Sequence, residues 1–79
     1  MSRNTTVSPD GKYSVAWGND HACGWFIQVF DLEHEDQDHP DAMVVNKDKL
    51  FDGIGPQDVI DIASEYGAGD RVQRDIIGL

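Results

Sequence analysis

The sequence predicts a small α+β domain: an antiparallel β-meander of three or four strands with one or two C-terminal helices packed on one face. Three observations predict it. Segments of alternating polarity occupy the first 46 residues, turn-forming residues separate them, and apolar residues at helical spacing follow only after residue 55. A chain of 79 residues has room for one core, so we expect one domain spanning residues 1–79.

The first two strands are expected to form a hairpin, residues 3–7 and 12–17. The Ser-Pro-Asp-Gly sequence between them favours a turn, because proline presets φ, aspartate bonds its own backbone and glycine allows a positive φ. Residues 18–24 are expected to form a loop, and residues 25–32 the strongest strand. Both faces of that strand carry apolar side chains, which is typical of a central strand covered on one side by a helix and on the other by a loop or a partner. A homodimer is compatible with this pattern.

A further short strand is expected at residues 42–46. The main helix should begin at Pro56, because proline suits the first helical position, and a short last helix should occupy residues 71–77. Leu50 and Phe51, which precede the main helix, are expected to pack beneath it. One apolar stripe follows the main helix at positions i, i+3, i+4 and i+7: Val59, Ile62, Ala63 and Tyr66.

The charge is concentrated in the middle of the chain. The sequence holds 15 acidic and 6 basic residues, for a formal net charge of −9. Residues 1–30 and 66–79 are each neutral, so the whole net charge lies in residues 31–65. An acidic loop is expected at about residues 32–41, in a run without lysine or arginine. Such asymmetry predicts an interaction face, and a solvated loop is the simpler alternative.

The same charge excludes several function classes. A strongly acidic chain lacks the basic surface that direct nucleic-acid binding requires, and an anionic membrane repels it. No apolar run approaches the roughly 20 residues of a membrane span, and the N-terminus has no apolar signal region. Cys23 is the only cysteine, so no internal disulfide forms. We therefore expect a cytoplasmic protein.

Enzymatic, metal and cofactor chemistry are not expected. The run containing His34 and His39 fails the EF-hand pattern, since counting from Asp31 gives Ala42 instead of glutamate at the twelfth position. A zinc site would need more soft ligands than Cys23 alone supplies. The same thiol, beside a loop histidine, lacks the orienting third group and the pocket that nucleophilic catalysis needs.

The candidate binding residues are carboxylates of the acidic loop and of the main helix. On the helix, Asp58, Asp61 and Glu65 recur at i, i+3 and i+7, and they spread over roughly 10 Å. Phosphates along one DNA strand advance by roughly 3.4 Å per nucleotide. A row of carboxylates at this spacing, beside an acidic loop, presents negative charge much as a short duplex does. The predicted partner-binding residues are Glu33, Glu35, Asp36, Asp38, Asp41, Asp58, Asp61 and Glu65.

In overall character the chain resembles the small phage-encoded inhibitors called anti-CRISPR proteins, particularly those that imitate DNA. It shares their small size, single domain, sharply acidic patch and lack of a catalytic motif. The resemblance implies a basic nucleic-acid-binding partner, such as a CRISPR surveillance complex of the host cytoplasm, whose DNA-binding groove the protein occludes. The alternative is a small acidic interaction domain adapted to high salt, without inhibitory activity. Salt adaptation should spread acids over the whole surface, whereas a binding face should gather them.

Overall fold

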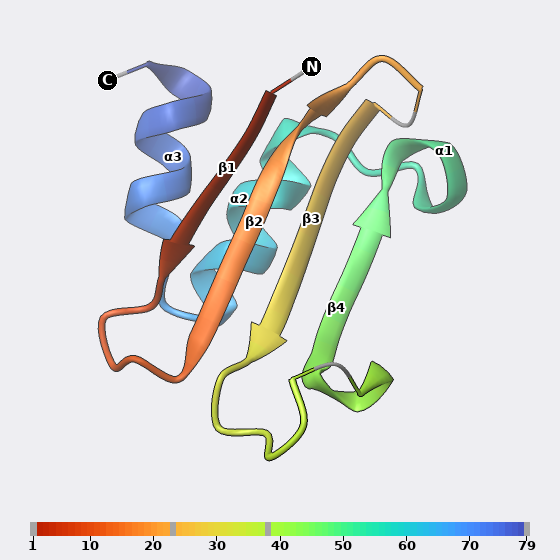
Figure 1. The fold of residues 1–79 in the computed structure, drawn as a ribbon. Coiled ribbons are helices and arrows are strands. Elements are labelled where there is room, and N and C mark those ends of the chain that lie inside the picture. Colours follow the sequence, from red (N-terminus) through yellow and green to blue (C-terminus); the bar gives the residue numbers. More distant parts are fainter. Residues whose placement is uncertain (1, 23, 38, 79) are drawn as a thin grey trace.

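Four strands form one antiparallel sheet in the order of the sequence (Figure 1). The computed structural model describes residues 2–22, 24–37 and 39–78. The α+β class predicted from the sequence is confirmed. The strands are β1 (Ser2–Val7), β2 (Tyr13–Asp20), β3 (Gly24–Asp31) and β4 (Met43–Asp48).

The helices follow the last strand, apart from a 3-10 turn, Pro40–Ala42, that leads into β4. The helix α2 lies behind the sheet and packs on β3, and α3 packs on α2 and beside β1 (Figure 1). Both therefore lie on one side of the sheet, as the sequence predicts. The helices are α1 (Lys49–Asp52), α2 (Pro56–Glu65) and α3 (Gly69–Ile77).

The core lies between the sheet and these two helices. In the register of the sheet, Val15 pairs with Val29 and Trp17 with Ile27, and all four side chains are fully buried. Alternation places them on one face, so burial of their apolar surface attaches the helices to the sheet. On the opposite face, Phe26 and Phe30 are half-buried.

The helix α2 buries much of the predicted stripe. Val59 and Ala63 have no exposed surface, and Ile62 and Tyr66 are half-buried. The neighbouring Ile60 is also buried, so the apolar face is wider than the sequence pattern indicated.

Two local expectations are wrong. Leu50 and Phe51 do not pack beneath α2; their side chains are 63% and 83% exposed on α1. Gly53, with φ of 71°, ends α1 after one turn, and Ile54 takes the buried place ahead of α2. Residues 18–24 form no long loop either, because β2 continues to Asp20 and pairs there with the start of β3.

The helix α3 is anchored to the sheet by one carboxylate. The buried Trp17 donates its indole N–H to Asp75 Oδ2 at 2.9 Å, and Asn4 Nδ2 donates to the same oxygen at 2.9 Å. Asp75 therefore supplies the acceptor that the buried indole N–H of Trp17 needs. The same carboxylate joins α3 to β1 and β2.

Replacing Asp75 by alanine should lower the free energy of unfolding by about 1–3 kcal/mol, because a buried N–H is left without an acceptor. Asp75→Asn should cost less, since its amide oxygen still accepts. Urea unfolding measures both. Gln73→Ala, at an exposed position of the same helix, is the control and should stay within about 0.5 kcal/mol of the parent. Equal effects of all three changes would contradict the anchor.

The turn between β1 and β2 is held by Ser8 and Asp10. Ser8 is buried; its hydroxyl donates to Asp10 Oδ1 at 2.6 Å and accepts from the Tyr13 amide at 3.1 Å. Hydrogen bonds from the Ser8 hydroxyl and the Lys12 amide stabilise the ionised carboxylate, so the pKa of Asp10 lies below its ordinary value of 3.8.

Since the folded pKa of Asp10 is depressed, its contribution to stability is complete above the unfolded value and is lost as the pH falls through the folded one. Unfolding measured from about pH 6 down to about pH 2.5 should therefore show a weaker acid dependence in Asp10→Asn than in the parent. Parallel profiles for parent and Asp10→Asn would exclude this role.

Candidate acidic interface

The acidic loop joins β3 to β4 at one end of the sheet (Figure 1). Its first part is closed by its own side chains. Asp31 Oδ1 accepts from the Glu33 amide at 2.9 Å, and Gln37 Nε2 donates to the carbonyl oxygens of Asp31 and His34 at 2.9 and 2.8 Å. One amide group thus fixes the path of residues 31–37.

Two histidines shape the second part of the loop. The rings of His34 and His39 stack, with their centroids 5.5 Å apart and an interplanar angle of 21°. His39 Nδ1 accepts from the Asp41 amide at 3.1 Å and so begins the 3-10 turn. Ala42, the last residue of this turn, is buried.

The predicted loop carboxylates are presented to solvent. Glu33, Glu35, Asp36 and Asp41 are all exposed, and Asp38 lies outside the described residues. Over residues 2–22, 24–37 and 39–78, no lysine or arginine takes part in an ion pair, and His39 Nδ1 lies 3.5 Å from Asp41 Oδ2, a contact that is an ion pair only when the ring is protonated. Among these residues, lysine and arginine therefore form no direct ion pairs with the carboxylates.

The predicted helix carboxylates are also exposed, but two of them have local partners. Asp58 Oδ2 accepts from the Gly55 amide at 2.9 Å and closes the start of α2, and Asp61 Oδ1 accepts from Gln57 Nε2 at 3.0 Å. The first turn of α2 lies toward the end of the sheet away from the acidic loop (Figure 1). The turn of α2 that contains Asp58 and the acidic loop therefore lie toward opposite ends of the sheet.

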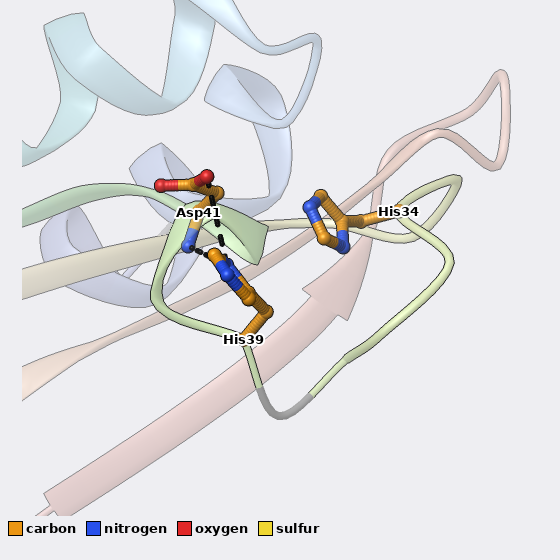
Figure 2. A group of neighbouring side chains, drawn as sticks. All are labelled: His34, His39 and Asp41. Atoms are coloured by element: carbon orange, nitrogen blue, oxygen red, sulfur yellow. Dashed lines mark hydrogen bonds and ion pairs between the residues drawn. The ribbon is translucent and has the colours of Figure 1, made fainter.

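A cluster that the sequence did not predict lies inside the loop. His34, His39 and Asp41 each place a potential metal-ligand atom within 4.8 Å of the others. Figure 2 shows the His34 ring extending across the loop toward the other two side chains. The spacing i, i+5, i+7 matches no regular helix or strand period, so only the folded loop reveals the cluster.

The uncovered face of the sheet carries a different group of side chains. The Arg3 guanidinium lies 5.8 Å from the centroid of the Phe26 ring and donates to Gln28 Oε1 at 3.2 Å. Asp20 and Asp48 also line the hollow of about 170 Å³ at this place. The half-buried state of Phe26 follows from this cover by a polar side chain.

Comparisons with known proteins found no relative: no protein-family model, curated protein or solved structure matches the chain. We therefore infer what this site can bind from its geometry alone. Among the described residues, no helix combines the length and the apolar composition needed to cross a membrane.

The loop geometry predicts that Gln37 controls local order. Gln37→Glu keeps the shape of the side chain but removes both N–H donors and places a carboxylate against two carbonyl oxygens. Hydrogen exchange of the backbone amides at residues 33–37 should become faster, whereas global unfolding should change by less than about 1 kcal/mol, because the loop is exposed. Gln57→Glu on α2 is the matched control and should leave loop exchange unchanged. Unaltered exchange in Gln37→Glu would exclude the clamp.

Proposed function

We propose that this protein is a non-enzymatic acidic inhibitor that occupies a basic, nucleic-acid-binding groove of a partner protein and blocks that groove by occlusion. The observation that carries the proposal is the exposed, unneutralised carboxylate charge of the β3–β4 loop. Glu33 and Glu35 are exposed and form no ion pair with a described lysine or arginine, so they are available to the basic side chains of another protein.

The distribution of charge in space supports a binding face over a general adaptation to salt. The neutral segments, residues 1–30 and 66–79, include β1 and α3, which lie side by side at one edge of the molecule (Figure 1). The net charge belongs to the segment that contains the loop, β4, α1 and α2. Adaptation to salt should have given these segments a net negative charge as well, whereas Asp70 and Asp75 of α3 are balanced by Arg71 and Arg74.

Within this segment, the loop is the better candidate for the contact. Its carboxylates protrude from one end of the sheet, and the local bonds of Gln37 and the histidines limit the entropy lost on binding. We therefore assign the leading contact to Glu33, Glu35, Asp36 and Asp41, and a secondary one to the helix acids Asp58, Asp61 and Glu65.

The partner that fits this surface is a groove lined with lysine and arginine that holds a nucleic-acid backbone. The duplex-binding channel of a CRISPR surveillance complex has this chemistry, because it recognises the backbone more than the bases. Carboxylates compete there for the same basic side chains as phosphates do. Such attraction mainly raises the association rate and is screened by salt.

The test has two stages. The tagged protein first captures partners from a CRISPR-bearing bacterial lysate at low salt and at about 0.5 M salt, where the Debye length is only a few ångströms. The captured complex is then purified, and its binding to labelled target DNA is measured with and without the protein. We expect capture at low salt only and loss of target DNA binding when the protein is added.

Two triple variants remove three charges each and test which surface makes the contact. Neutralising the loop, Glu33→Gln, Glu35→Gln and Asp41→Asn, should weaken inhibition about tenfold, as three exposed ion pairs of about 0.5 kcal/mol each would give. The helix variant, Asp58→Asn, Asp61→Asn and Glu65→Gln, should weaken it less. Unchanged target DNA binding in the presence of the protein would refute the proposal, and folding only in molar salt would favour the salt-adapted interaction domain.

A further inference from the structure

The acidic loop contains a second feature that does not depend on any partner protein. Two imidazole rings and one carboxylate converge there, and their potential ligand atoms lie within 4.8 Å of one another. We propose that His34, His39 and Asp41 bind one divalent transition-metal ion, with Zn²⁺ the representative ion. From the sequence alone no metal is expected here, because the run fails the EF-hand pattern and Cys23 is the only thiol.

The type of ligand selects the metal. Imidazole nitrogen suits Zn²⁺, Cu²⁺ and Ni²⁺, whereas Mg²⁺ and Ca²⁺ favour sites made of oxygen ligands. Two histidines with one carboxylate are a ligand set found at zinc sites that keep a fourth position for water. The two imidazole rings, and not the acidity of the loop, therefore favour a transition-metal ion.

The geometry needs a small local adjustment. Tetrahedral zinc with bonds of about 2.0–2.1 Å holds its ligand atoms about 3.3 Å apart, so the three groups must close by at most about 1.5 Å. The side chains of His39 and Asp41 are 49% and 78% exposed, and none of the three residues belongs to the buried core. Rotation of these side chains can therefore bring them together without disturbing the core.

The surroundings of His34 support the ligand role. Its Nδ1 lies 2.9 Å from the carbonyl oxygen of Asp36 and 3.1 Å from the amide nitrogen of the same residue. In the first contact Nδ1 must carry the proton and donate it, and in the second it must accept, so the two contacts require different tautomers. The tautomer that donates Nδ1–H to the carbonyl leaves the Nε2 lone pair free for a metal, which is how metal-bound histidines are usually oriented. Metal binding at Nε2 selects this tautomer.

Metal binding at His39 would break the hydrogen bond that the ring now accepts from the Asp41 amide. Its Nδ1 now accepts from the Asp41 amide, so in the neutral ring the proton is on Nε2. A metal bound through Nε2 requires the proton on Nδ1, and a metal bound through Nδ1 displaces the amide contact. In either case the start of the 3-10 turn is altered, and the loop amides should report metal binding directly.

The experiment uses the untagged full-length chain in metal-free buffer, titrated with ZnCl₂ by calorimetry and followed by NMR of the backbone amides and histidine rings. All proteins carry Cys23→Ser, so that the only thiol does not contribute. We expect one Zn²⁺ per chain, shifts confined to residues 33–43, and the Nδ1–H tautomer at His34. A large excess of Mg²⁺ should not displace Zn²⁺, because Mg²⁺ favours oxygen ligands and the site offers two imidazole nitrogens.

Matched variants locate the site. His34→Gln and His39→Asn should each weaken Zn²⁺ binding about tenfold or more; asparagine still accepts the amide that caps the 3-10 turn, so His39→Asn keeps the fold. His21→Gln changes the third histidine, in the β2–β3 turn at the other end of the sheet, and should bind as the parent does. The proposal is overturned if no Zn²⁺ binds, if His21→Gln weakens binding as much as His34→Gln, or if Mg²⁺ competes equally.

Discussion

The buried indole N–H of Trp17 needs an acceptor, and this requirement determines where the last helix lies. Asp75 supplies the acceptor from a position 58 residues further along the chain, and its second bond, to Asn4, joins the same helix to the first strand. With α3 held there, Val72 enters the core beside the buried face of α2. The position of α3 on the sheet depends on this contact and on the burial of Val72.

The fold could be predicted where local patterns decide it. Alternating apolar residues give the strands, and Val59 and Ala63 at helical spacing give the buried face of α2. The prediction failed where one backbone angle or one distant pairing decides the outcome. Gly53 adopts a positive φ that ends α1, so Ile54 is buried in place of Leu50 and Phe51. The pairing of Asp20 with Gly24 shortens an expected loop to a turn.

The candidate site was predictable in composition but not in arrangement. The acids of the loop and of α2 could be identified from their charge, and those that the structure describes are exposed. The separation of the first turn of α2 from the loop could not be predicted, because it depends on the direction in which α2 crosses behind the strands. The contact between His34 and His39 depends on the path that Gln37 imposes on the loop, and Gln37 carries no pattern that would mark it as a clamp.

The connectivity of the sheet has a consequence for the order of assembly. Each strand pairs with its neighbour in sequence, so the hairpins close short loops at little entropic cost. The bond between Asn4 and Asp75 spans 71 residues and closes nearly the whole chain. The meander can therefore form before α3 docks, and α3 is the element whose release leaves the strand pairing intact. The molecule thus contains a cooperative unit of lower stability at its C-terminal helix, and the indole of Trp17 is the group uncovered when that unit opens.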